Sequence, residues 1–267
     1  MAFYARTFIF DGIPSEFYDL YIGEFGGTGD STSDGSNDVE LLTEKLFRRP
    51  SPLFFGAEQD PVLDFSLSAY FQRELSAQEY SGVSKWLFGQ QKYKVLRICQ
   101  EDMQQVYFNA FLTAPSIRRI GNMIQGFEAK VICDAPWGWR DSKTYPYVFS
   151  DDSVYATTKL FNESTNSFYT YPTTLYFKAN LFGGTVKITN LTDDPNELRP
   201  MIQINLLPNE QITMNCDLQF IASTLSYYPL QNFNKNWLRF VPGLNNLKIE
   251  GSLLELAIVS PIAVKVG

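Results

Sequence analysis

The sequence contains no histidine among its 267 residues. Histidine is the general base of Ser-His-Asp and Cys-His systems and the commonest metal-ligating side chain. Its absence excludes these catalytic groups and every zinc site that uses imidazole. The three cysteines, Cys99, Cys133 and Cys216, are too few for a four-cysteine zinc site. Each lies in an apolar, strand-like context, so we expect buried, reduced thiols.

Long apolar runs and basic clusters are also missing. No stretch reaches the ~20 apolar residues that span a bilayer, and residues 1–10 lack the features of a signal peptide. We therefore expect no membrane insertion. The formal net charge is -7, and the longest basic runs are the pairs Arg48-Arg49 and Arg118-Arg119. Nucleic-acid binding depends on clustered Lys and Arg, so we expect no nucleic-acid partner.

Motifs for other chemistry are weak. The adjacent acids Asp151-Asp152 and Asp193-Asp194 offer the two carboxylates that a glycosidase needs, but neighbouring strand residues point to opposite faces. The segment 30–38 only partly matches a calcium loop, because Leu41 stands where the last acidic ligand belongs. The sequence therefore predicts no enzyme activity, no bound metal and no cofactor.

Aromatic residues and short alternating segments dominate what is present. The 22 Phe and 15 Tyr favour strands over helices. The length allows two domains, each with its own core. We predict a mainly β protein with two β-sandwich domains, at residues 1–140 and 141–267. Segment 26–38, which reads GGTGDSTSDGSND, is predicted to be a mobile loop.

One helix stands out among the predicted strands. Residues 77–88 carry an apolar stripe, Ser76 and Glu79 form a capping box, and Gly89 marks the end. The strands predicted before residue 140 are 3–10, 20–22, 39–43, 53–57, 62–70, 93–98, 106–113 and 123–133. Residues 141–168 are predicted to be an irregular connector with some extended pieces. After it, strands are predicted at 174–179, 185–190, 201–206, 211–215, 219–221, 237–240, 246–250, 254–259 and 262–266.

Six segments of the first half follow one another in a characteristic order. They are FIFDGIPSEFYDLYI at 8–22, VLDFSLSAY at 62–70, SAQEYSGVSKWLFG at 76–89, KYKVLRI at 92–98, VYFNAFLTAPSI at 106–117 and GFEAKVICDAPWGWR at 126–140. Their succession resembles the distal tail protein (Dit) family of siphophages. In the second half, YTYPTTLYF at 169–177 and LRFVPGLNNLKIEG at 238–251 extend the resemblance more loosely.

The resemblance implies a structural, non-enzymatic protein of the virion, at the distal end of the tail and assembled in the host cytoplasm. It implies a homohexameric ring that joins the tail tube protein to a hub or fibre protein of the adsorption apparatus. A receptor-binding protein or host saccharide is a further implied partner. The N-terminal domain, with its helix and a projecting β-hairpin, would form the ring. The C-terminal domain would be a galectin-like β-sandwich outside it.

A closed ring needs two different patches on each subunit, and obligate interfaces are rich in aromatic residues. The run Leu53, Phe54 and Phe55 is more apolar than one alternating strand face requires. We place the ring interface at this run together with Phe65 and Tyr70. Core packing explains the same residues equally well, so both interpretations stand.

The alternative function is a carbohydrate-binding module that contacts saccharide on the host cell surface. Tyrosines exposed on a β-sandwich can stack on sugar rings. The candidate contacts are Tyr169, Tyr171, Tyr227 and Tyr228. A lectin should bind glycan as a monomer, whereas a hub subunit should assemble without glycan.

Overall fold

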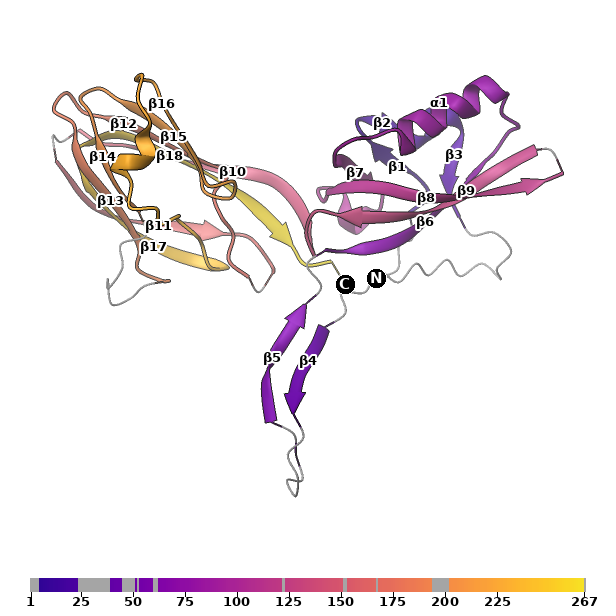
Figure 1. Cartoon of the computed structure of the whole chain (residues 1–267), viewed down its shortest axis with the longest axis horizontal. Coiled ribbons are helices and arrows are strands. Elements are labelled where there is room, and N and C mark those ends of the chain that lie inside the picture. The colour runs from indigo at the N-terminus through magenta and orange to yellow at the C-terminus, as the bar shows by residue number, and fades with distance from the viewer. Residues whose placement is uncertain are drawn as a thin grey trace. The chain divides into compact units, whose positions relative to one another are not determined.

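The computed structural model describes residues 5–23, 39–44, 51, 53–59, 62–121, 123–150, 153–166, 168–193 and 202–266. The loop predicted at 26–38, the partial calcium motif and the Asp151-Asp152 pair lie outside them. The chain divides into two compact units, Met1–Trp139 with Lys265–Gly267, and Arg140–Val264. The predicted mainly β class is confirmed, with α1 (Ala77–Phe88) as the one α-helix among the described residues (Figure 1).

A seven-stranded antiparallel sheet builds the N-terminal unit, in the order β2-β1-β7-β8-β9-β6-β3. Its strands are β1 (Phe8–Phe10), β2 (Ile13–Pro14), β3 (Leu20–Ile22), β6 (Asp64–Phe71), β7 (Lys94–Ile98), β8 (Phe108–Ile120) and β9 (Met123–Cys133). The backbone N–H of Ile22, at one edge, donates to the carbonyl of Arg6, just before β1, at 2.9 Å. The sheet thus curls until its edges meet, and one sheet supplies both layers around the core.

Helix α1 has the predicted bounds and lies over this curled sheet (Figure 1). Ser76 and Glu79 form the predicted capping box, and the N–H of Gly89 donates to the carbonyl of Lys85 at the C-terminus. Val83 and Leu87 are buried. The indole Nε1 of Trp86 donates to the carbonyl of Phe10 at 2.9 Å, which fixes the helix to β1.

Two strands of the N-terminal unit form a sheet of their own. β4 (Val39–Glu44) and β5 (Leu53–Gln59) pair in antiparallel register, and Figure 1 shows them paired with each other alone. The register shifts by one residue between Leu42 and Thr43, where Phe55 is the extra residue on β5. This β-bulge re-aims the neighbouring side chains of the hairpin.

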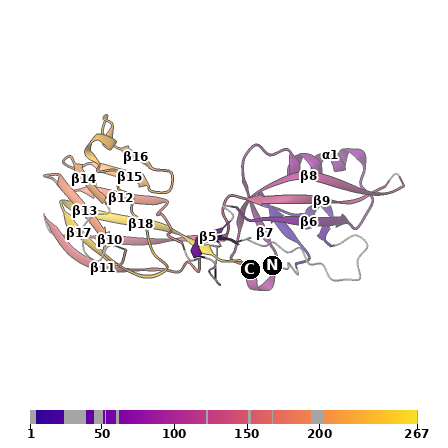
Figure 2. The same ribbon diagram turned by 60° about the horizontal axis from the view of Figure 1, so that its bottom comes forward.

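The C-terminal unit is a sandwich of two antiparallel sheets, as Figure 2 also shows. The five-stranded sheet has the order β10-β18-β12-β15-β16 and the four-stranded sheet the order β11-β17-β13-β14. The strands are β10 (Gly138–Val148), β11 (Val154–Asn162), β12 (Thr174–Ala179), β13 (Gly184–Asn190), β14 (Ile202–Leu206), β15 (Gln211–Asn215), β16 (Phe220–Ser223), β17 (Gly243–Gly251) and β18 (Leu253–Val264).

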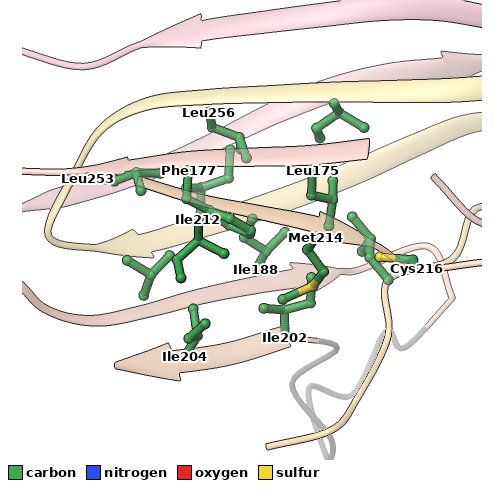
Figure 3. Close-up of a cluster of buried hydrophobic side chains, with 14 of the residues drawn as sticks. Leu175, Phe177, Ile188, Ile202, Ile204, Ile212, Met214, Cys216, Leu253 and Leu256 are labelled. Carbon is green, nitrogen blue, oxygen red and sulfur yellow. The ribbon is translucent and has the colours of Figure 1, made fainter. Parts of the chain in front are cut away.

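Alternate residues of both sheets meet in a single apolar core (Figure 3). Leu175 and Phe177 of β12 face Ile188 of β13 and Ile204 of β14, and all four are fully buried. This alternation of buried and exposed positions is the pattern expected of sheets that pack face to face. Burial of such side chains supplies the main stabilising free energy of the unit.

Several predicted elements are corrected by the structure. The segment 141–168, predicted as an irregular connector with some extended pieces, holds most of β10 and all of β11, so its extended pieces are full strands of the sandwich. β10 is largely exposed, and β11 exposes Tyr155 and Phe161 but buries Asn162, so residue polarity does not reveal their buried faces. Predicted strand 237–240 contributes only an isolated bridge between Thr170 and Phe240. Cys99, predicted to be buried, is exposed, whereas Cys133 and Cys216 are buried as predicted.

Candidate functional site

The hairpin exposes two of the five residues of the predicted ring interface. Phe54 and Phe55 are 65% and 64% exposed, and Leu42 on the opposite strand is 42% exposed. Leu53 is half-buried. A two-stranded hairpin by itself is marginally stable in water. We call Leu42, Phe54 and Phe55 the hairpin patch.

The other two predicted interface residues do not join this patch. Phe65 is 4% exposed and packs edge-to-face against Phe108, with ring centroids 5.9 Å apart. Its assignment to the interface is corrected, because its side chain belongs to the core of the curled sheet. Tyr70 is half-buried beside Tyr21, with ring centroids 6.2 Å apart.

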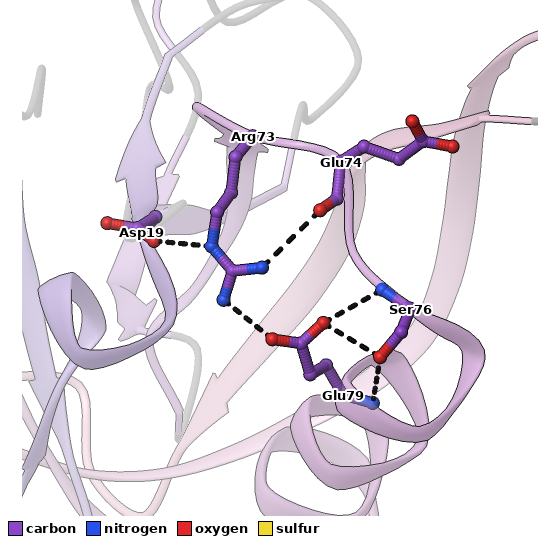
Figure 4. Close-up of polar contacts among 5 residues, drawn as sticks. All are labelled: Asp19, Arg73, Glu74, Ser76 and Glu79. Atoms are coloured by element: carbon purple, nitrogen blue, oxygen red, sulfur yellow. Dashed lines mark hydrogen bonds and ion pairs between the residues drawn. The ribbon is translucent and has the colours of Figure 1, made fainter.

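A charged cluster fixes the start of α1 against β3 (Figure 4). Arg73 Nε donates to Asp19 Oδ2 at 2.7 Å, and its Nη2 donates to Glu79 Oε1 at 2.8 Å. The other carboxylate oxygen of Glu79 accepts from the backbone N–H of Ser76 at 2.8 Å. The bond from Arg73, followed by those from Ser76, lowers the pKa of Glu79 to about 2. The cluster therefore has a positioning role, which the sequence indicated only through the capping box.

The four candidate tyrosines lie on two separate segments. Tyr169 and Tyr171 follow β11, whereas Tyr227 and Tyr228 precede the 3-10 helix Pro229–Asn232. Tyr169 is 42% exposed and Tyr228 is 61% exposed. Tyr171 is half-buried against the core of the sandwich. Tyr227 is also half-buried, and burial raises the pKa of its hydroxyl to about 12.

Two charged residues that the sequence did not single out as ligand contacts lie beside Tyr169. The guanidinium carbon of Arg239 is 3.8 Å from the ring centroid of Tyr169. Its Nε and Nη2 donate to the two carboxylate oxygens of Asp193, at 2.9 and 3.3 Å. The sequence offered Asp193 as one carboxylate of a glycosidase pair, but Arg239 neutralises it. Its neighbour Asp194 is not among the described residues.

The described residues offer little for other chemistry. None of them form a group of three or more Cys, Asp or Glu that could hold a metal ion. In the same residues no helix is long and apolar enough to cross a membrane. Burial raises the pKa of the Cys133 and Cys216 thiols to about 12. These two thiols therefore stay protonated and unreactive near neutral pH.

The geometry defines a class of protein: a curled sheet with one helix and a separate hairpin, followed by a β-sandwich. The crystal structure of Dit (gp 19.1) from phage SPP1 has this fold, with a TM-score of 0.68, 10% sequence identity, and coverage of 96% of this chain and 98% of Dit. A chain of the activated phage P2 baseplate with calcium gives a TM-score of 0.49 at 12% identity, covering 98% of this chain and 99% of its own length. No curated protein matches the chain by sequence.

Two family models match the chain. The model described as phage tail protein N-terminal domain matches residues 3–135, and the model described as phage tail C-terminal domain matches residues 137–259. The chain therefore belongs to this phage tail protein family. The resemblance to the Dit family drawn from the sequence is confirmed at the level of the fold, and the protein is a phage tail protein.

Proposed function

We propose that the protein is a non-enzymatic hub subunit that forms a hexameric ring at the distal end of the tail. The ring connects the tail tube protein to a hub or fibre protein of the host-adsorption apparatus, after assembly in the host cytoplasm. Residues 1–140 form the ring, and residues 141–267 form a galectin-like sandwich that carries further adsorption partners. The observation that supports ring formation best is the hairpin patch.

The physical argument rests on the cost of exposing this patch. Two neighbouring phenylalanines, each more than 60% exposed, leave a large apolar area in water on a hairpin that pairs with no third strand among the described residues. Fully burying one such side chain is worth about 1.5–3 kcal/mol. A contact between copies that covers Phe54 and Phe55 therefore stabilises both the hairpin and the assembly. SPP1 Dit is described as a paradigm of the hub adsorption apparatus, which agrees with this role.

The proposal is tested by the mass of the purified chain in solution. Light scattering over a concentration series should give about six times the 30.5 kDa of one chain. The double variant Phe54→Ser, Phe55→Ser should lose this mass and keep the circular dichroism of the folded protein. Phe182→Ser is the matched control, because Phe182 is 69% exposed on a turn of the C-terminal unit. It should assemble normally.

Two outcomes would contradict the proposal. A wild-type chain that remains a monomer at every concentration, alone and with a tail tube protein present, rules out the ring. An assembled wild type whose mass is unchanged by the double variant keeps the ring but removes the hairpin patch from its interface.

A second candidate function is saccharide binding by the C-terminal unit. The observation that favours it is the ordered group of Tyr169, Arg239 and Asp193, which combines an exposed ring with a fixed guanidinium and carboxylate. Host cell-wall polysaccharide should bind the wild type, and Tyr169→Ala should weaken binding without changing the mass of the assembly. Equal binding by wild type and Tyr169→Ala would remove this site.

A further inference from the structure

The outer face of the four-stranded sheet in the C-terminal unit carries exposed rings and lysines. Val154 and Leu160 of β11 face the core. The alternate residues Tyr155, Lys159 and Phe161 therefore point outward. Tyr155 is 75% exposed and Phe161 is 54% exposed. The two rings are six positions apart on one strand, so about 20 Å of sheet separates them. This length suits an extended ligand rather than a compact one.

The neighbouring strands continue this face with polar side chains (Figure 2). Asn246 of β17 lies directly across from Lys159. Glu250 of β17 lies across from Tyr155, and Lys187 of β13 lies across from Glu250. Direct partners in a sheet have their side chains on the same face, so these groups line one surface. We call it the sheet platform, and it consists of Tyr155, Lys159, Phe161, Lys187 and Asn246.

The platform is positively charged, although the net charge of the whole chain is -7. Glu250 is the only acid in the four strands of this sheet, and Lys248 Nζ lies 3.5 Å from its carboxylate. Lys159 and Lys187 have no ion pair with any described residue. Three lysines against one acid leave two positive charges on this face.

The carboxylates that directly follow these strands are also neutralised. Glu163, just after β11, lies 2.5 Å from Lys143. Asp193, just after β13, accepts from Arg239 at 2.9 Å. These described acids therefore do not cancel the positive charge of the platform.

The ring of Tyr155 is held in place on one side only. Lys248 Nζ lies 5.5 Å from the ring centroid, which is within the range of a cation–π contact. The same ammonium group is held by Glu250, so it is fixed between the ring and the carboxylate. Because Tyr155 is 75% exposed, the opposite face of its ring is open to a ligand.

We propose that the sheet platform binds a linear acidic polysaccharide whose sugar units carry carboxylate or phosphate groups. The open rings of Tyr155 and Phe161 stack on sugar rings. Lys159 and Lys187 form charge-assisted hydrogen bonds with the anionic groups. The net negative charge of the chain repels such a polymer elsewhere, so binding is directed to this face. The site is separate from the group at Tyr169 and does not depend on the proposed ring.

Calorimetric titration of the full-length protein with three forms of one polymer tests the proposal. Carboxymethyl-dextran and dextran phosphate should bind, and binding should weaken as salt is raised. Unmodified dextran should not bind. The anionic form that binds more tightly identifies the group that the lysines recognise. Poly-glutamate, which carries carboxylates without sugar rings, should bind more weakly than carboxymethyl-dextran.

Matched variants place the binding on the platform. Lys187→Gln should weaken binding about fivefold. Lys178→Gln removes the same charge from the opposite, five-stranded sheet, where Lys178 is paired with Glu255 at 2.6 Å, and should bind like the wild type. Tyr155→Ala should weaken binding, whereas Tyr155→Phe keeps a ring and should retain it. Circular dichroism of each exposed variant should match that of the wild type.

Four outcomes would overturn the platform. The first is equal binding of unmodified dextran, and the second is poly-glutamate binding as tight as that of carboxymethyl-dextran, which would indicate a polypeptide partner. The third is a loss of binding in Tyr169→Ala but not in Tyr155→Ala, which would favour the other candidate site. The fourth is a chain that assembles into six copies and binds none of the polymers, in which case the ring stands and the platform does not.

Discussion

The two units of the chain bury their apolar side chains in different ways. The C-terminal sandwich encloses Leu175, Phe177 and Ile188 completely between two sheets. The N-terminal unit curls one sheet around Phe8 and Phe10 but leaves a second, two-stranded sheet with its phenylalanines in water. A complete core needs no partner to enclose it, whereas an exposed apolar hairpin is the surface that the proposed ring would cover. This difference supports the proposal that the N-terminal unit carries the contacts between subunits, while the C-terminal unit folds around its own core.

The largest effect is expected from a substitution that leaves a cavity in the C-terminal core, which tests whether the two units are independent. Phe177 is fully buried in β12, so Phe177→Ala should destabilise the sandwich by about 3–5 kcal/mol. If the units are independent, hydrogen exchange read by mass spectrometry should speed up throughout 174–264. Exchange in 62–133 should not change.

The matched control is Phe108→Ala, at a fully buried position of the N-terminal sheet. It should give the converse result, with faster hydrogen exchange in the N-terminal unit alone. If either substitution speeds up exchange in both units equally, they fold as one cooperative body and the comparison fails.

A second prediction concerns the polar groups buried at one end of the sandwich. Asn245 is fully buried, and its side chain donates to the carbonyls of Val241 and Gly243 and accepts from Val241 and Asn190. Asn245→Ala leaves these buried groups without partners, which should cost about 1–3 kcal/mol. Chemical denaturation should show the loss in the C-terminal unit. Asn246→Ala, at the neighbouring half-buried position of β17, should cost much less.

The third prediction sharpens the role of α1 in the N-terminal unit. Ser76 Oγ accepts from the backbone N–H of Glu79 at 3.3 Å, so Ser76→Ala should cost about 1 kcal/mol. The change should appear as faster exchange at the start of α1. Ser76→Asn retains a capping oxygen and should restore most of the stability. No recovery with Asn would mean that the cap does not stabilise the helix.

Much of the fold was predictable because its signals are local. The bounds of α1 followed from a capping box, an apolar stripe and a terminal glycine, all within fourteen residues, 76–89. Strands such as β12 and β15 alternate cleanly, since one face is buried. β10 and β11 lack this signal in the sequence, because β10 is largely exposed and β11 exposes Tyr155 and Phe161 while burying Asn162. The curled sheet closes through the backbone hydrogen bond from Ile22 to Arg6. Such a backbone contact between separate segments has no local sequence pattern that would predict it.

The candidate surfaces were harder to predict, because exposure is a property of the folded chain. Phe54 and Phe65 both stand in strand segments, yet one is 65% exposed and the other 4% exposed. Only the separation of β4 and β5 from the main sheet explains this difference. Likewise, the pairing of Arg239 with Asp193 joins residues 46 positions apart. No sequence pattern around either residue predicts this ion pair.

The smallest expected effect is a change in acid sensitivity at the exposed Arg73 cluster. The pKa of Glu79 is about 2 in the folded chain, against an ordinary value of 4.5, so its ionised form is favoured by folding. Its contribution is therefore fully present above about pH 5 and is lost as pH falls through about 2. Glu79→Gln retains a capping-box side chain but cannot titrate. The variant should lose less stability than the wild type on acidification, measured by urea unfolding followed through tryptophan fluorescence.

Glu74→Gln is the control for this prediction, because Glu74 contacts Arg73 through its backbone carbonyl (Figure 4). Three of the four tryptophans, Trp86, Trp137 and Trp139, lie in the N-terminal unit, so the fluorescence change reports mainly on that unit. Equal acid sensitivity of wild type and Glu79→Gln would show that the cluster does not couple protonation to folding. A reduced sensitivity confined to Glu79→Gln would show that α1 is held to β3 partly by charge, whereas the C-terminal unit is held by its enclosed apolar core.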